Sequence, residues 1–163
     1  MTSLTDFRDA CVISDHVQAV ISPGTYPAPL PDLFPENMVQ EAQDEIVAWP
    51  GYAPTPLHSL APLAEALNIA TLHYKDESGR FGLGSFKALG GAYAVIKTIS
   101  GLIGQSTGTK PALSKVRSGN LAAQTAEITV ATATDGNHGR SVAWGAQLAG
   151  CNCVIYIHSE VSK

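Results

Sequence analysis

The pattern that most constrains this chain is a pair of short apolar stretches with one amphipathic stretch between them. Residues 128–133 and 153–157 are apolar and bounded by polar or turn-forming residues, which predicts strands. Residues 138–149 have the periodicity of a helix, and residues 69–74 with a helix from Ser85 repeat the arrangement earlier in the chain. Strands that alternate with helices favour crossover units, so we expect an α/β fold: a parallel sheet with crossover helices.

The remaining segments predict an arm and an insertion. Six of the ten prolines lie in residues 1–50, which predicts a Pro-rich N-terminal arm ahead of an organised domain at 51–163. Residues 100–127 exceed a usual connection of about 4–6 residues, so we expect a surface insertion there. Further helices are expected at 37–49, at 57–67 and near 121–126.

The expected sheet lacks part of its cover. A parallel sheet needs helices on both of its faces. The pattern offers two crossover helices and the helix at 57–67, which are too few to cover it. We therefore expect an incomplete sheet, and a chain that is a fragment or one half of a site whose other half lies elsewhere.

Composition and charge limit the classes of function. With 10 Lys and Arg against 14 Asp and Glu, the net charge is -4, and no basic cluster offers a surface for nucleic acid. No apolar run reaches the roughly 20 residues of a transmembrane helix, and Asp6, Arg8 and Asp9 lie where a secretory signal would be apolar. We expect a cytoplasmic protein without nucleic-acid or membrane partners. Its histidines and cysteines lack the spacing of a metal site, so we expect no metal.

Two helix starts hold the candidate site residues, because ligands bind open parallel sheets where strands end and helices begin. The first is Ser85-Phe86-Lys87, which places Lys87 in the first turn of a helix and in apolar company. The positive end of the helix dipole disfavours a charged ammonium there, and an uncharged lysine is suited to imine formation with an aldehyde. The alternative is an ordinary surface lysine whose stem packs on apolar neighbours.

The second helix start is the loop from Thr134 to Gly139. Its backbone N–H groups can receive a carboxylate or phosphate, and Gly136 and Gly139 would let a ligand approach the backbone. Asp135 and Asn137 could each simply cap the helix, but two caps in three residues exceed what capping requires. An aspartate beside an anion site opposes binding unless it has a chemical role, and such conflicts often mark function.

These segments together resemble a known family. Two runs closely resemble diaminopropionate ammonia-lyase, a pyridoxal-phosphate (PLP) enzyme related to the tryptophan synthase β chain: KDESGRFGLGSFKALGGAYA, from Lys75 to Ala94, and DGNHGR, from Asp135 to Arg140. The resemblance covers about residues 50–163. It implies an incomplete tryptophan synthase β-like PLP-dependent fold, with residues 51–163 as a partial PLP-dependent enzyme domain.

The resemblance also implies roles for single residues. Lys87 resembles the lysine that carries PLP, and Asn137 resembles the residue that binds the cofactor's ring hydroxyl. The substrate carboxylate would lie in the loop formed by Thr134, Asp135, Gly136 and His138. Dehydratases and synthases of the superfamily usually have serine in place of Asp135, so the aspartate favours the ammonia-lyase. Lys87 and Asp135 would be the two catalytic bases, on opposite faces of the substrate.

The reaction implied is an α,β-elimination that converts 2,3-diaminopropionate to pyruvate and ammonia, in a protein that forms a homodimer when full length. The superfamily's phosphate-binding loop and its ligand for the pyridine nitrogen correspond to sequence beyond Lys163. Two alternatives stay open. One is a related PLP lyase or dehydratase acting on serine or threonine, against which Asp135 argues, and the other is a non-catalytic truncated α/β module.

Overall fold

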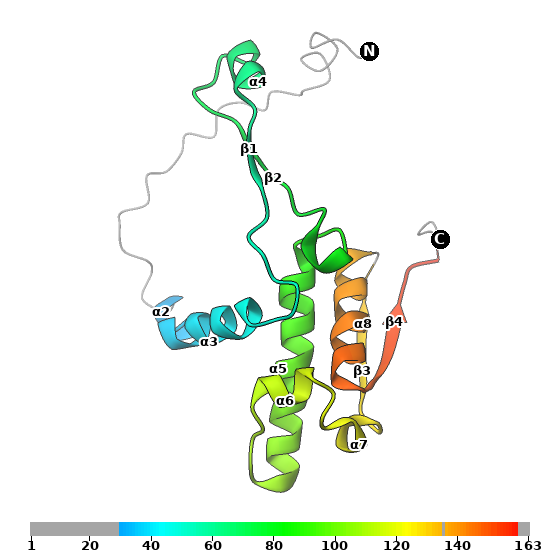
Figure 1. The fold of residues 1–163 in the computed structure, drawn as a ribbon. Helices are drawn as coiled ribbons and strands as arrows, with labels where there is room; N and C mark the ends of the chain where they lie inside the picture. The colour runs from blue at the N-terminus through cyan, green and yellow to red at the C-terminus, as the bar shows by residue number, and fades with distance from the viewer. Residues whose placement is uncertain (1–29, 135, 160–163) are drawn as a thin grey trace. The chain divides into compact units, whose positions relative to one another are not determined.

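The computed structural model describes residues 30–134 and 136–159, which Figure 1 traces in colour. The chain divides into two compact units. The first unit comprises residues 1–36 and 57–74, and the second comprises residues 37–56 and 75–163. Most of the expected Pro-rich arm lies outside the described residues, and its boundary near residue 50 stays a prediction. No helix in the described part of the chain is long and apolar enough to cross a membrane.

The first unit contains a two-stranded sheet and short helices. Its elements are α2 (Leu30–Leu33), β1 (Leu57–Ser59), α4 (Ala61–Ala66) and β2 (His73–Lys75), whose last residue belongs to the second unit. β1 pairs with β2, and next to this pairing the Leu60 amide donates to the Leu72 carbonyl at 2.9 Å. The helix expected at 57–67 is confirmed only from Ala61 onward. Pro62 explains the difference, because proline is tolerated in a first turn and not inside a helix.

The strand expected at 69–74 is corrected by the structure. The strand begins at His73, and it pairs with β1 instead of joining the parallel sheet. Asn68 adopts a φ of 54° just after α4, and the Ile69 amide then donates back to the Ala64 carbonyl at 3.0 Å. Residues 69–72 therefore form the loop that follows the end of α4, and they are not part of a strand. A short apolar run does not by itself identify its pairing partner.

The second unit contains the predicted crossover. Strands β3 (Thr129–Ala133) and β4 (Asn152–Tyr156) are parallel, in a register that pairs Thr129 with Asn152 and Ala133 with Tyr156. Helix α8 (Asn137–Ala149) connects them, which confirms the predicted α/β fold. The other elements from residue 36 onward are α3 (Glu36–Val47), the 3-10 helix η1 (Arg80–Gly82), α5 (Lys87–Thr107), α6 (Leu113–Arg117) and α7 (Ala122–Thr125).

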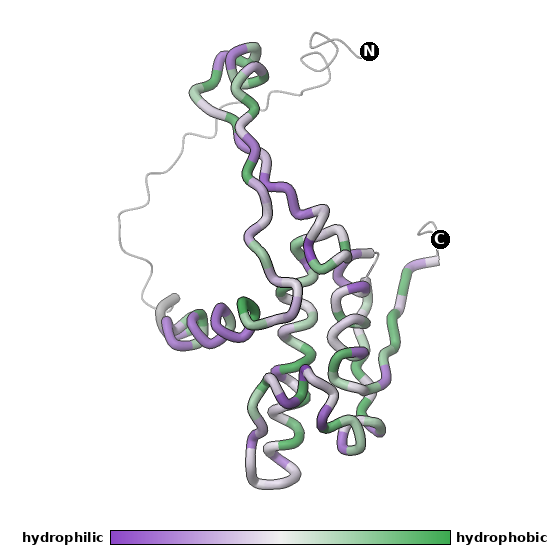
Figure 2. Tube along the Cα trace, in the orientation of Figure 1, coloured by the Kyte–Doolittle hydropathy of each residue, from purple (hydrophilic) through white to green (hydrophobic). Residues whose placement is uncertain are grey.

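Described residues cover one face of the parallel sheet. Helix α8 lies on that face, where a Cβ added to Gly139 would lie 3.1 Å from Ile155 Cγ2. On the other face Val154 and Tyr156 are 40% and 65% exposed. Figure 2 shows the apolar stretch along β4. Because parallel sheets bury both faces, the bare face agrees with the expectation of an incomplete sheet.

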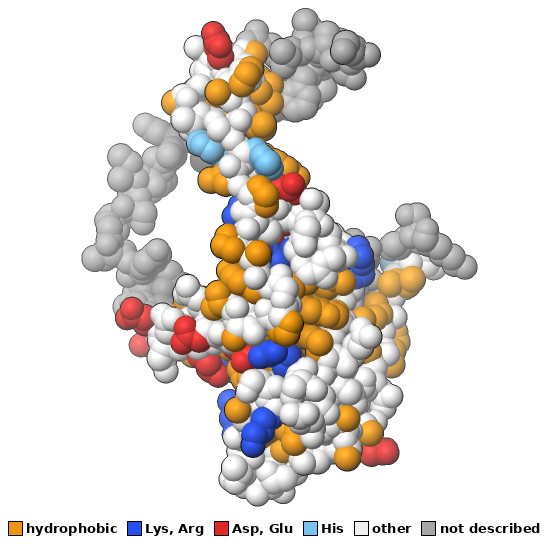
Figure 3. Space-filling view, viewed as in Figure 1, with side chains coloured by type: hydrophobic (Ala, Val, Ile, Leu, Met, Phe, Trp, Pro, Cys, Tyr) orange, Lys and Arg blue, Asp and Glu red, His pale blue; other side chains and the backbone are white. Residues whose placement is uncertain are grey.

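Helix α3 joins its neighbours through ion pairs, and none of its residues is buried. Arg117 Nε lies 2.7 Å from Glu45 Oε1, and Lys97 Nζ lies 2.8 Å from Glu41 Oε2. Figure 3 shows the acidic side chains gathered along α3, with basic side chains beside them. The helix expected at 37–49 is thus confirmed as far as Val47.

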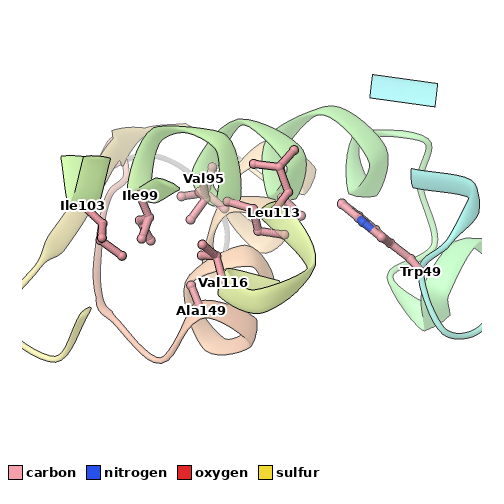
Figure 4. Close-up of a cluster of buried hydrophobic side chains, with 10 residues drawn as sticks. Trp49, Val95, Ile99, Ile103, Leu113, Val116 and Ala149 are labelled. Carbon is pink, nitrogen blue, oxygen red and sulfur yellow. The ribbon is translucent and has the colours of Figure 1, made fainter. Parts of the chain in front are cut away.

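The core lies among α5, α6 and α8, with Trp49 at one end of the buried cluster (Figure 4). Its buried members are Trp49, Ala92, Val95, Ile96, Ile99, Ile103, Leu113, Val116, Val142 and Ala149. Isoleucines of α5 recur at three- and four-residue intervals, so one face of the helix is apolar and packs inward.

The segment 100–127 contributes to this core, which corrects the expectation that it lies at the surface. Helix α5 continues to Thr107, and α6 buries Leu113 and Val116 against it. The buried Ser100 hydroxyl also donates to the Pro111 carbonyl at 2.7 Å. The burial was not predicted because small and polar residues dominate the segment, so its few apolar residues gave no clear periodic pattern. The helix expected near 121–126 is confirmed as α7.

Candidate active site

The two helix starts predicted to hold the site belong to helices that pack side by side and point the same way. A Cβ on Gly91 of α5 would lie 2.5 Å from Ser141 Oγ of α8, and a Cβ on Gly145 would lie 2.8 Å from Ala92 Cα. The contacts advance in the same direction along both helices, so the helices are parallel, as Figure 1 shows. Lys87 precedes Gly91 by four residues, and Asn137 precedes Ser141 by four. The two helix starts therefore lie at the same end and at a similar level.

Lys87 is the first residue of α5, as predicted. Its amide donates to the hydroxyl of buried Ser85 at 3.1 Å, which satisfies one of the free amides at the helix start. The Lys87 side chain is exposed, with Nζ 5.1 Å from the centroid of the Phe86 ring. The backbone is thus fixed while the amine stays accessible to a small molecule.

A buried polar network fixes the loop that leads to Lys87, and the sequence patterns did not identify it. Arg80, only 7% exposed, donates through Nε to Glu77 at 2.8 Å and through Nη1 to the Ala53 carbonyl at 2.8 Å. The Thr55 hydroxyl accepts from Arg80 at 3.1 Å and donates to the Glu77 carboxylate. Lys75 Nζ donates to the Thr55 carbonyl at 2.6 Å. The network fastens residues 53–55 to the segment before Lys87.

The charges of this network follow from its hydrogen bonds. The bonds from Arg80 and Thr55 lower the pKa of Glu77 from 4.5 to about 2, although burial acts in the opposite direction. The bond to Glu77 in turn raises the pKa of Arg80. The pair is therefore ionised at neutral pH. The only visible sign in the sequence was an acidic and a basic residue three positions apart.

Aromatic packing holds the same loop against α8. Phe81 adopts a φ of 48°, in the left-handed region that non-glycine residues rarely occupy. Its ring lies 5.0 Å from Trp144 of α8 and 5.6 Å from Trp49, centroid to centroid. These ring contacts hold the Phe81 backbone in its left-handed conformation, because a non-glycine residue keeps that conformation only where the surrounding structure imposes it.

The second helix start follows the carboxyl end of β3, as predicted. The Thr134 amide donates to the Tyr156 carbonyl at 2.9 Å, which extends the pairing of β3 with β4 by one residue. The Thr134 hydroxyl accepts from the Gly136 amide at 3.2 Å. Asn137 and His138 then begin α8 with exposed side chains. Asp135 lies outside the described residues.

The two glycines of this loop have different surroundings. A Cβ on Gly139 would lie 2.5 Å from Thr134 Cγ2 and 3.1 Å from Ile155 Cγ2, so Gly139 lets α8 approach the sheet. This corrects the expectation that Gly139 makes room for a ligand. A Cβ on Gly136 would have no neighbour within 4 Å. Room for a ligand at Gly136 stays a prediction.

The arrangement brings together an accessible amine and a helix start that can bind an anion. Lys87 lies at the start of α5, and Thr134, Gly136, Asn137 and His138 lie at the start of α8. Amides in a first turn lack partners within their helix and attract negative charge. An aldehyde cofactor with a ring hydroxyl, and a substrate with a carboxylate, need these groups, so the residues fit PLP chemistry. The described residues contain no cluster of three or more His, Cys, Asp or Glu placed to bind a metal ion.

Comparisons with known proteins agree with this chemistry. The diaminopropionate ammonia-lyase of Salmonella typhimurium is 43% identical over 108 residues, which are 66% of this chain and 26% of that protein. The apo crystal structure of Escherichia coli diaminopropionate ammonia lyase gives a TM-score of 0.63 at 38% identity, over 78% of this chain and 33% of that one. The same enzyme in complex with an aminoacrylate-PLP azomethine reaction intermediate gives 0.60 at 39% identity, over 80% and 31%.

The chain spans about a quarter to a third of the length of these relatives. The family model for pyridoxal-phosphate dependent enzymes matches residues 48–163, which is most of the chain and includes both helix starts. The chain belongs to the family of pyridoxal-phosphate dependent enzymes.

Proposed function

We propose that this chain supplies part of the active site of a PLP-dependent ammonia-lyase, which converts 2,3-diaminopropionate to pyruvate and ammonia by α,β-elimination. One observation carries the proposal: Lys87 and Asn137 begin two parallel helices at the same end of their contact. The substrate is proposed from the similarity to proteins named diaminopropionate ammonia-lyase.

Lys87 would hold the cofactor and move a proton. Bound PLP supplies an aldehyde and an electron-withdrawing ring that stabilises negative charge on the substrate Cα. The exposed amine of Lys87 would hold the cofactor through that aldehyde and, once released from it, would accept the Cα proton of the substrate. Asn137, exposed at the start of α8, would donate its side-chain amide N–H to the ring oxygen.

The loop before α8 would orient the substrate. The backbone amides around Gly136 and His138, with the Thr134 hydroxyl, are the proposed partners of the substrate carboxylate. Asp135 is proposed as the second base, which acts on the opposite face of Cα. Its negative charge would also attract the second ammonium group of a diamino acid, whereas serine at this position could not.

The proposal includes the setting of the enzyme. We propose that the enzyme is a cytoplasmic homodimer. Residues 51–163 would form a partial enzyme domain, and the site would be completed by segments equivalent to those that longer members of the family contain. The resemblance of the sequence motifs supports this assembly. Sedimentation of the full-length protein measures the dimer directly.

Product formation tests the proposed reaction. The full-length protein, which completes the proposed site, is incubated with PLP and either 2,3-diaminopropionate or serine, and pyruvate is measured for the wild type, Lys87→Ala and the control Lys115→Ala. We expect pyruvate from 2,3-diaminopropionate with the wild type and the control, and none with Lys87→Ala. Faster pyruvate release from serine would favour a dehydratase. Absence of pyruvate from both substrates would reject the proposed reaction.

A further inference from the structure

Ser141 makes an unusual contact between the two helices that carry the proposed site. Its side chain is only 1% exposed, and its Oγ accepts a hydrogen bond from the Ala92 amide at 2.9 Å. Ala92 lies inside α5, where amides ordinarily bond to the carbonyl four residues earlier. A hydroxyl of α8 therefore reaches the backbone of α5.

Gly91 makes this contact possible. A Cβ at position 91 would lie 2.5 Å from Ser141 Oγ and 2.8 Å from Ser141 Cβ, distances that real side chains do not tolerate. Gly145, one turn further along α8, comes equally close to Ala92. The contact therefore depends on glycines on both helices, and the hydroxyl is its polar element.

We infer that Ser141 is a positioning residue, whose hydroxyl sets the separation and alignment of the two helix starts that carry Lys87 and Asn137. Each of these residues lies four positions before the contact, about 6 Å along its helix. Any shift of one helix against the other at this level moves the amine relative to the amide. The consequence for cofactor attachment rests on the proposed function, whereas the structural role does not.

Matched variants separate positioning from general stability. Ser141→Ala removes the hydroxyl at the helix starts. Thr125→Val removes another fully buried hydroxyl, which donates to the Ala149 carbonyl at 2.7 Å at the far end of α8. We expect both variants to lower the melting temperature by similar amounts. Only Ser141→Ala is expected to speed amide exchange of Ala92, by about 5- to 10-fold as for one lost hydrogen bond.

A second variant tests whether packing alone sets the spacing. The exchanged pair Gly91→Ala with Ser141→Gly preserves side-chain volume across the contact and removes the hydroxyl. If the hydroxyl positions the helices, the pair behaves like Ser141→Ala. Recovery of wild-type exchange at Ala92 in the exchanged pair would overturn the inference, and so would equal Ala92 exchange in Ser141→Ala and Thr125→Val.

The cofactor supplies the second readout. Borohydride reduction after addition of PLP measures the fraction of Lys87 modified, and we expect a several-fold lower fraction and a shifted absorption maximum in Ser141→Ala but not in Thr125→Val. Equal modification in both variants, with wild-type modification at Lys87, would contradict the positioning role. If the wild type is not modified at Lys87, the proposed function fails for this chain, and the Ala92 exchange rates alone decide the role of Ser141.

Discussion

The two helix starts of the proposed site are held by different means. Side chains fix the start of α5: Arg80 and Glu77 form a largely buried ion pair ahead of it, and the Ser85 hydroxyl accepts a hydrogen bond from the Lys87 amide. The start of α8 is shaped by backbone, since glycine at 139 lets the helix approach the sheet. In the proposed site, the residue that would bond to the cofactor therefore has a rigid backbone, whereas the anion site would be formed by the backbone of a helix start.

The largest effect is expected from removing the Arg80–Glu77 ion pair that precedes α5. Arg80→Ala would leave the Glu77 carboxylate without its partner in a mostly buried place, and we expect a loss of about 3–5 kcal/mol in the free energy of unfolding. Urea denaturation measures it. The control is Lys97→Ala, which breaks a more exposed pair with Glu41 and should cost about 0–1 kcal/mol. Equal losses in the two variants would contradict the special role of the Arg80 network.

Acid titration probes the same network. Glu77 has a pKa of about 2 in the folded chain and an ordinary value of 4.5, so the folded state gains stability above pH 4.5. That contribution, at most about 3 kcal/mol, is lost as the pH falls from 4.5 through 2. Denaturation across this range should show a steeper loss in the wild type than in Glu77→Gln. Parallel curves would show that Glu77 titrates normally.

A smaller effect is expected from breaking the start of α8. In Gly139→Ala the new Cβ meets Thr134 and Ile155, so we expect a loss of about 1–3 kcal/mol in the free energy of unfolding. The measurement is again urea denaturation. A neutral or stabilising result would mean that the loop before α8 shifts to accept the new Cβ at little cost. Close approach at Gly139 would then not be what holds the start of α8.

The smallest effect has the opposite sign. Gly90 and Gly91 are neighbours in α5, but a Cβ at Gly90 meets nothing within 4 Å. Gly90→Ala should therefore stabilise the chain by about 0.5–1 kcal/mol, because alanine favours the helix. Thermal unfolding of Gly90→Ala beside Gly91→Ala checks this, and Gly91→Ala should destabilise. The same sign in both variants would contradict the close contact at Gly91.

Periodicity predicted the parts of the fold in which one segment determines its own structure. The strands β3 and β4 were predicted because they are short apolar runs bounded by polar or turn-forming residues, and the helix α8 was predicted because its periodicity matches its buried face. The pairing of β2 with β1 was not predicted, since a short apolar run does not specify its partner. The burial of Leu113 and Val116 was missed because polar residues surround them in sequence.

The residues of the candidate site likewise fall into those that local sequence predicted and those that it did not. Lys87 and the loop from Thr134 to His138 could be predicted, because helix starts after turns have local signatures and the motifs resemble a family. The contact of Ser141 with Ala92 and those of Arg80 with Ala53 and Thr55 could not, because they join segments 25 or more residues apart. Such contacts depend on packing that local pattern does not encode.

The most direct test of the central claim is the site of cofactor attachment. The purified chain is mixed with PLP, reduced with borohydride, digested and analysed by mass spectrometry, with Lys87→Arg as the control. The account predicts one modified lysine, Lys87, and loss of that modification without a replacement in Lys87→Arg. Modification spread over the exposed lysines, unchanged in Lys87→Arg, would contradict the claim that α5 and α8 form the reactive half of a PLP site.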